Sequence, residues 1–179
     1  MSEIIDIVDE NDEIIGQNTR HESYRTLSRN RIVFVVLLHG ESIYLQRRSA
    51  SCSFCPWALD ITAGGHVSHS QTYKEAAYRE LFEEVWVEWI DLRFHSKTKW
   101  DRFEIDKKYQ PNKELIRGKS HEFFREVYEC EYDGKFTFDD WEVEEVMLFS
   151  KKELHKMIEN KEYMTPSCVD ILTKYYLDN

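Results

Sequence analysis

The 179-residue sequence has little of what marks linkers, membrane spans or secretion. Three prolines and six glycines leave no linker-like tract, and no internal repeat divides the chain. No apolar run approaches the roughly 18–20 residues that span a bilayer, and the N-terminal residues are acidic where a secretory signal is basic. We therefore expect a soluble, cytoplasmic protein with one domain over residues 1–179.

Cysteine is also scarce, with four residues at Cys52, Cys55, Cys130 and Cys168. Without a secretion signal, these are expected to be reduced thiols rather than a disulfide framework. The Cys52-x-x-Cys55 pair matches half of a structural zinc site. The other two cysteines stand alone in the sequence, so the pattern favours free thiols over zinc.

Basic residues are outnumbered, 24 Lys and Arg against 34 Asp and Glu, for a net charge of −10. This balance argues against nucleic acid or an anionic membrane as a partner. Residues 93–119 nevertheless hold nine basic and four acidic residues, a local charge of +5. We interpret this segment as a basic insertion that closes over an anionic substrate, with a solvated loop as the alternative.

Apolar patterns predict the main elements. Two short apolar runs around an acidic turn predict an N-terminal hairpin at about residues 3–20, and a second hairpin is expected at 32–46. Further strands are expected at 120–132 and 144–150.

Three helix starts are marked by capping residues. Thr72 and Ser150 each have a glutamate three residues later, which is the capping-box pattern, and Thr165-Pro166 supplies an N-cap with proline at the first helical position. Because strands and helices are interspersed rather than strictly alternating, we expect an α/β sandwich with a mixed sheet.

The first of these helices concentrates acidic residues. Glu80, Glu83 and Glu84 lie at spacings of three and four, where like charges repel by roughly 0.2–0.5 kcal/mol per pair. We expect them on the face opposite the apolar residues, which include Ala76 and Leu81. A solvated acidic face is the ordinary explanation for such a cluster.

Two adjacent glycines, Gly64 and Gly65, precede this helix and let the backbone approach a ligand closely. Hard divalent cations take six or more oxygen ligands, and carboxylates with a backbone carbonyl supply several of them. The combination favours a metal site over a merely solvated face.

Residues Gly65 to Val87 carry a family resemblance. Gly65, five residues, Gln71, seven residues and then Arg79-Glu80-Leu81-Phe82-Glu83-Glu84 resemble the signature of the Nudix hydrolases. Segments near residues 6–17, 44–49 and 142–154 are similar to a branch that includes isopentenyl diphosphate isomerase. The resemblance implies a Nudix-like α/β/α sandwich in which the motif forms a loop-helix-loop.

The resemblance also implies roles for the motif residues. Glu80, Glu83 and Glu84 would bind Mg²⁺ or Mn²⁺ with the Gly64 carbonyl as a further ligand, and Arg79 would orient the carboxylates. The implied reaction is hydrolysis of a diphosphate joined to another group, often a nucleoside. Glu80 or Glu83 would take the proton of the attacking water.

Other candidates lie outside the motif. Arg47 and Arg48 are expected to meet the phosphates, and one of Glu142, Glu144 and Glu145 to serve the metal, the water or the substrate. Strand alternation would place Glu142 and Glu144 on one side and Glu145 on the other. Aromatic residues that could stack on a base are Trp57, Trp100 and Tyr109. The partner is a small-molecule diphosphate, and a homodimer is possible.

Two positions depart from the family pattern. Gln71 stands in place of a glutamate, which removes one negative charge and should weaken metal binding. Trp86 stands in place of the glycine after the helix, where a left-handed residue is common and a bulky one costs roughly 1–2 kcal/mol. We therefore expect the helix to end differently.

Two other functions stay open. An isopentenyl diphosphate isomerase would need a cysteine where Ala63 and Gly64 stand, although His66 matches a histidine of that enzyme. A non-catalytic sensor that binds a nucleotide without cleaving it would explain Gln71 and Trp86.

Overall fold

The computed structural model describes residues 3–102, 121–138 and 141–177. The strands are β1 (Ile4–Val8), β2 (Ile14–Thr19), β3 (Asn30–His39), β4 (Ser42–Arg48), β5 (Leu59–Ile61), β6 (Ala63–His66), β7 (Arg93–Asp101), β8 (Glu122–Glu131) and β9 (Val143–Ser150). The helices are α1 (Arg20–Thr26), α2 (Tyr73–Val85), α4 (Lys151–Glu159) and α5 (Pro166–Leu172), and a π-helical turn η1 (Thr173–Leu177) follows α5.

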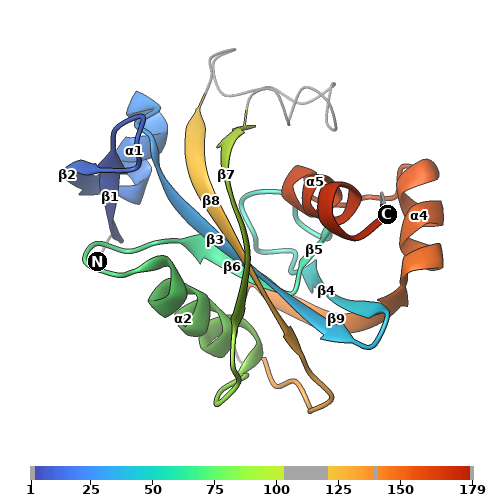
Figure 1. Ribbon diagram of the computed structural model, residues 1–179. Helices are drawn as coiled ribbons and strands as arrows, with labels where there is room; N and C mark the ends of the chain where they lie inside the picture. The colour runs from blue at the N-terminus through green and yellow to red at the C-terminus, as the bar shows by residue number, and fades with distance from the viewer. Residues whose placement is uncertain (1–2, 103–120, 139–140, 178–179) are drawn as a thin grey trace.

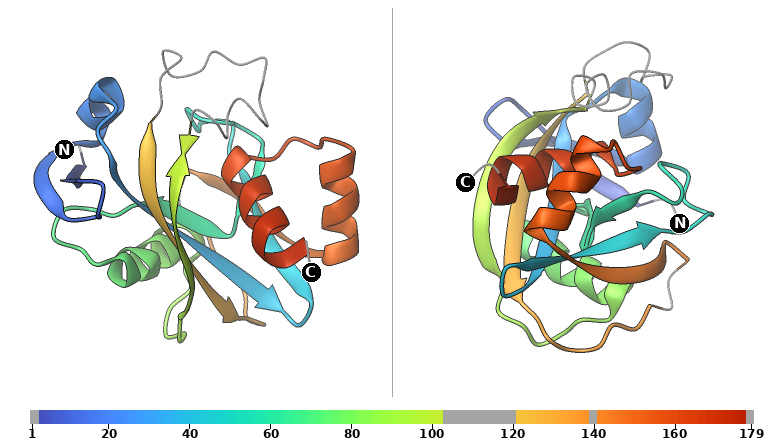
Figure 2. Two further views of the ribbon diagram at one scale, coloured as in Figure 1. Left: turned by 45° about the horizontal axis from the view of Figure 1, so that its top comes forward. Right: turned by 90° about the vertical axis from the view of Figure 1, so that its right-hand side faces the viewer.

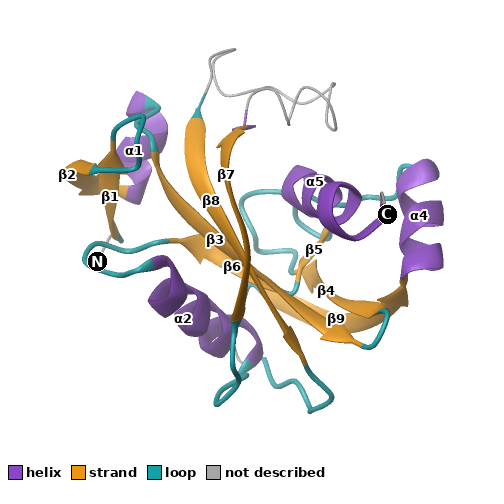
Figure 3. Ribbon diagram, viewed as in Figure 1, coloured by secondary structure: helices purple, strands orange, loops and turns teal. Residues whose placement is uncertain are grey.

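Seven strands form one sheet in the order β5-β4-β3-β8-β7, with β6 also paired to β3 and β9 to β4. The β3–β8 pair is parallel and the other pairs are antiparallel, so the predicted mixed sheet is confirmed. Helix α2 covers one face, and α4 and α5 cover the other (Figure 1, Figure 3). Each face has its own apolar core, which makes an α/β/α sandwich.

Strand partners change in the middle of the sheet. β4 pairs with β3 only at Ser42 and Ile43 and then with β5, whereas β3 pairs with β6 from Ile32 to Val35. β5 pairs with β4, and the next strand, β6, pairs with β3. The chain therefore passes from β4 to β3 at the junction between β5 and β6. Thr62 lies at the crossing, where its hydroxyl accepts from the Leu37 amide and donates to the Tyr44 carbonyl.

An N-terminal hairpin of β1 and β2 lies where the sequence predicts one. The left view in Figure 2 places it, together with α1, on the side of the sheet opposite α4. Helix α1 was not predicted, although Thr19 caps it by accepting from the Glu22 amide. The Thr-x-x-Glu spacing was a usable signal for this helix.

The predicted basic insertion is partly wrong. Residues 93–101 form β7, an edge strand of the sheet, and residues 103–119, which include Tyr109, lie outside the described residues. β7 is stable beside β8 because basic side chains on one strand face acidic ones on the other. The pairs are Arg93–Glu129 (2.5 Å), Lys97–Glu126 (3.5 Å) and Lys99–Glu122 (3.1 Å).

The predicted helix starts are confirmed. Thr72 and Ser150 both form complete capping boxes, and Thr165 accepts from the Cys168 amide at the start of α5. Within the described residues, no helix combines the length and the apolarity needed to cross a bilayer.

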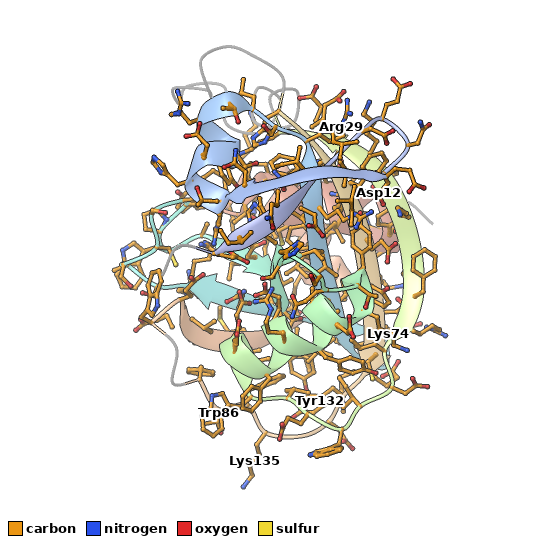
Figure 4. The ribbon with its side chains drawn as sticks, turned by 90° about the vertical axis from the view of Figure 1, so that its left-hand side faces the viewer. Asp12, Arg29, Lys74, Trp86, Tyr132 and Lys135 are labelled. Carbon is orange, nitrogen blue, oxygen red and sulfur yellow. The ribbon has the colours of Figure 1, made fainter. Side chains whose placement is uncertain are left out.

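The expectation that α2 ends differently is wrong. Trp86 itself adopts the left-handed conformation at the C-cap (φ 54°), and its ring stacks on Phe82 at 5.7 Å between centroids. The stacking offsets part of the conformational cost. Trp86 lies at the end of α2 away from Asp12 (Figure 4).

Asp12 joins the hairpin to the rest of the domain. This nearly buried carboxylate accepts from Arg31 Nε (2.6 Å) and Tyr73 Oη (3.0 Å), and it pairs with Lys97 (2.5 Å). One side chain in the β1–β2 turn thereby contacts β3, β7 and the first residue of α2. The hairpin is thus bonded directly to the beginning of α2.

We predict that Asp12→Asn lowers the free energy of unfolding by about 2 kcal/mol, the scale of a charge-assisted hydrogen bond. Asparagine tolerates the left-handed backbone of this position (φ 67°), so the change tests the charge. Asp9→Asn in the same turn is the control, because the Asp9 carboxylate accepts from the Asn11 and Glu13 amides within its own turn and does not bond to β3, β7 or α2 in the described residues. Equal urea midpoints for the two variants would contradict this role of Asp12.

Candidate functional site

Two of the three motif glutamates are buried, contrary to the expectation of an acidic face opposite the apolar residues. The buried stripe of α2 consists of Tyr73, Ala76, Ala77, Glu80, Leu81, Glu84 and Val85. This is the helical spacing of three and four, so Glu80 and Glu84 share a face with Leu81. Their residues are only 7% and 4% exposed, whereas the Glu83 side chain is 50% exposed.

Glu84 reaches the crossing between the strands. Its Oε2 accepts from the side-chain amide of Gln46 on β4 (2.8 Å) and from the Gly64 amide on β6 (3.3 Å). The sequence analysis does not identify Gln46, although a polar residue after the apolar Ile43 and Leu45 is a signal for it.

The Gly64 carbonyl lies on the same edge of β6 as its amide. In an antiparallel strand the N–H and C=O of one residue point the same way. Because the amide meets Glu84 rather than β3, the carbonyl also turns from β3 towards the carboxylates. The geometry therefore presents carboxylate and carbonyl oxygens together.

Arg79 connects the remaining groups of the motif. Its guanidinium pairs with Glu80 (2.8 Å) and Glu83 (2.8 Å) and donates to the His66 carbonyl (2.7 Å). Gln71 Oε1 accepts from Arg79 Nε (3.2 Å). The glutamine that departs from the family pattern therefore still contributes an acceptor to Arg79.

The two glycines are required by close packing inside the protein. A Cβ at Gly65 would lie 2.2 Å from Glu80 Oε1, and one at Gly64 would lie 2.4 Å from the Phe34 ring and 2.8 Å from the Val33 carbonyl. The two glycines were expected to let a ligand approach the backbone closely. They also have a structural role, because side chains at these positions would clash inside the protein. Glycine at 65 makes room for a buried carboxylate.

Burial changes the protonation of this pair. Desolvation raises the pKa of Glu80 to about 7; the Arg79 charge opposes the rise and the Glu83 charge adds to it. Desolvation also raises the pKa of Glu84 well above its usual value, with further contributions from Glu80 and Glu142. Desolvation is the largest cause of both shifts, so burial makes ionisation of this pair costly.

The donor set partly fits a hard divalent cation. Glu80, Glu84 and the Gly64 carbonyl supply oxygen atoms, which are the ligands that such cations prefer. Over residues 3–102, 121–138 and 141–177, no group of three or more His, Cys, Asp or Glu side chains is already arranged to hold a metal. Glu83 would have to leave Arg79 to complete such a group.

The two arginines before the motif are not brought together. Arg48 lies near Asp60 (3.6 Å), and the Glu84 and Glu142 charges act on it. Arg47 pairs with Glu145 (2.7 Å). Its cross-strand neighbour Leu59 belongs to the core under α4 and α5, so Arg47 lies on the face away from α2.

The predicted alternation of the three late glutamates is wrong. A register shift lies between Arg47 and Arg48, where Arg47 faces Glu145 and Arg48 faces Val143. Glu144 is the extra residue of this bulge, and a bulge breaks the alternation of side chains. Of the three, Glu142 is the one whose charge acts on Glu84.

The remaining candidates lie outside this cluster. His66 is buried, and its ring faces Tyr24 and Phe123 at 5.6 and 6.3 Å between centroids. Trp100 packs on Phe123, whereas Trp57 is half exposed in a loop. The four cysteines form no disulfide, and Cys52 and Cys55 are buried.

Comparison with known proteins identifies the family. The NUDIX domain model matches residues 28–168. An uncharacterized Nudix hydrolase of Nostoc sp., all7351, is 46% identical over 86 residues, which are 46% of this chain and 50% of that protein. This chain spans about half the length of the first curated relatives that it matches.

Solved structures share the fold. DR0079 from Deinococcus radiodurans superposes with a TM-score of 0.75 and 26% identity over 97% of this chain and 99% of that one. A bifunctional NMN adenylyltransferase/ADP ribose pyrophosphatase from Francisella tularensis, complexed with AMP and a Mn ion, has a TM-score of 0.58 and 18% identity over 86% of this chain and 44% of that one. The second likeness shows the fold alone.

We predict that the metal-free protein loses stability as pH rises from about 5 to 8. A carboxyl whose folded pKa is raised contributes stability below its unfolded pKa of 4.5, and that contribution is lost as pH passes the folded value, about 7 for Glu80. The measurement is urea unfolding in EDTA at several pH values. Glu80→Gln, which cannot titrate, should show a flatter profile; a profile identical to that of wild type would contradict the assignment.

Proposed function

This chain belongs to the Nudix family, and on that premise we propose that it is a metal-dependent pyrophosphohydrolase that cleaves a diphosphate linkage in a nucleoside diphosphate derivative or a similar small molecule. The observation that carries the proposal is the burial of Glu80 and Glu84 beside Gly64, whose amide donates to Glu84. Residues 1–179 act as one Nudix-like domain in this proposal.

Mg²⁺ or Mn²⁺ would be held by Glu80, Glu83, Glu84 and the Gly64 carbonyl. A bound cation neutralises diphosphate oxygens and lowers the pKa of a bound water. Glu83 would have to exchange its Arg79 contact for the cation, and Arg79 would keep its contacts with Glu80 and the His66 carbonyl. In that arrangement the guanidinium would hold the Glu80 carboxylate in place.

Glu80 and Glu83 are the two candidate bases. Burial raises the pKa of Glu80 to about 7 in the metal-free protein, and a bound cation would lower it. Glu83 is half exposed beside Arg79 and is the second candidate. In either case the carboxylate takes the proton from the attacking water.

Substrate phosphates would meet Arg48, whose guanidinium lies in the field of Glu84 and Glu142. Glu142 stays a candidate for contact with the substrate or its bound cation. Arg47 was proposed for the same role, but it would first have to leave Glu145 and faces the other side of the sheet. We therefore assign the phosphate contact to Arg48 before Arg47.

The isomerase alternative is weaker than hydrolysis. Ala63 and Gly64 stand where the reaction needs a cysteine, and the buried His66 ring faces aromatic rings. The sensor alternative retains one supporting observation, the Arg79–Glu83 pair that holds a motif carboxylate away from the buried two.

We predict that Glu84→Gln lowers Mg²⁺-dependent phosphate release at least about 100-fold, because it removes a charge from the cation site. Glu83→Gln should have a comparable effect. The assay is a panel of nucleoside diphosphate derivatives and isopentenyl diphosphate, with wild type in parallel. Glu88→Gln, outside the motif, is the matched control and should match wild type. Binding of a panel member by wild type without turnover would instead establish the sensor.

We predict that Gln71→Glu strengthens Mn²⁺ binding modestly, by about two- to fivefold, and leaves the fold unchanged. The new carboxylate keeps the acceptor for Arg79 and adds negative charge. Calorimetric titration of both proteins with Mn²⁺ measures the difference. Weaker binding by the variant would show that the glutamine amide itself is needed.

A further inference from the structure

Gln46 is a buried amide without an assigned role. The residue is 2% exposed and lies on β4 between Leu45 and Arg47. Its Nε2 donates to Glu84 Oε2 at 2.8 Å, and its Oε1 is buried without a hydrogen-bond partner. An unpaired buried acceptor is destabilising, so its retention beside two carboxylates requires an explanation.

The hydrogen bond from Gln46 helps to determine which oxygen of Glu84 is left to bind another ligand. Both hydrogen bonds that the described residues give this carboxylate, from Gln46 and from the Gly64 amide, go to Oε2. The two donors fix the carboxylate plane and leave Oε1 as the atom for another ligand. Bonds from two different strands define this orientation better than either bond alone.

The side-chain amide of Gln46 is uncharged, and this affects the carboxylate that it contacts. A lysine or arginine at this position would also hold Glu84, but its charge would neutralise the carboxylate and compete with a cation. Glutamine orients the carboxylate without adding a positive charge that would neutralise it. Its free Oε1 adds an uncharged oxygen of the kind that hard cations and their bound waters accept.

We propose that Gln46 is a positioning residue of the cation site: its Nε2 holds Glu84 so that Oε1 of that carboxylate faces the ion, and its own Oε1 accepts a hydrogen bond from water on the ion. This inference rests on the proposed function. It concerns the affinity and geometry of the site rather than the identity of the substrate.

The test is Mn²⁺ binding by the full chain. Gln46→Met keeps the approximate size and removes both polar groups, and we expect it to weaken Mn²⁺ binding by about 10- to 100-fold, the usual effect of losing a partner of a metal ligand. The electron paramagnetic resonance spectrum of any remaining bound Mn²⁺ should also change. Gln46→Asn, one methylene too short to reach Glu84, should weaken binding in the same direction and serves if the methionine variant does not fold.

Asn30→Leu is the matched control. Asn30 is also a buried amide with an unpaired side-chain oxygen, but it donates to Ser23 and Ser28. We expect this variant to lose stability and keep wild-type Mn²⁺ affinity. Mn²⁺ should therefore raise the midpoint temperature of unfolding less in the Gln46 variants than in wild type. In Asn30→Leu it should raise this temperature as much as in wild type.

The outcomes separate the two proposals. Wild-type affinity and an unchanged spectrum in a folded Gln46 variant would overturn the role of Gln46 and leave the hydrolase proposal intact. Absence of Mn²⁺ binding by wild type would overturn both. An equal loss of affinity in Asn30→Leu would show that general destabilisation, rather than Glu84 orientation, controls binding.

Discussion

The structure depends on two carboxylates being buried where the chain crosses from β4 to β3. Glu80 and Glu84 occupy the apolar stripe of α2, and a buried charge is costly unless it is paired and hydrogen-bonded. Arg79 pairs with Glu80, but the described residues give Glu84 only amide donors. In the function that we propose, a divalent cation beside Gly64 would complete this arrangement.

The sheet and the hairpin hold these carboxylates in place. Thr62 bonds to both β3 and β4 at the crossing, and glycine at 65 leaves room for Glu80. Asp12 links the N-terminal hairpin to Tyr73 at the start of α2. These contacts together restrict how α2 can move relative to the strands. Such restriction favours a site whose carboxylates are already in position before a ligand binds.

Local signals in the sequence predicted local features well. The caps at Thr72, Ser150 and Thr165 are short-range patterns, and the structure confirms them. The spacing of the motif likewise identified the family without any information on the fold. By contrast, the burial of Glu80 and Glu84 depends on what α2 packs against, and treating charge as a sign of exposure placed them on the wrong face.

Long-range pairing explains the other errors. β7 is a strand because its basic residues meet acidic residues on β8, which are more than 20 positions away in the sequence. The bulge at Glu144 depends on the register with β4, and the separation of Arg47 from Arg48 depends on which strands flank them. Gln46 was missed for the same reason, because only the fold places it against Glu84.

The most direct measurement is a crystal structure of the protein with Mn²⁺, with the ion located by its anomalous scattering. The account predicts an ion bound by oxygen atoms of Glu80 and Glu84 and by the Gly64 carbonyl, with Glu83 turned from Arg79 towards it. A structure at saturating Mn²⁺ with no ion at this position, and with Glu83 still paired to Arg79, would contradict the central claim.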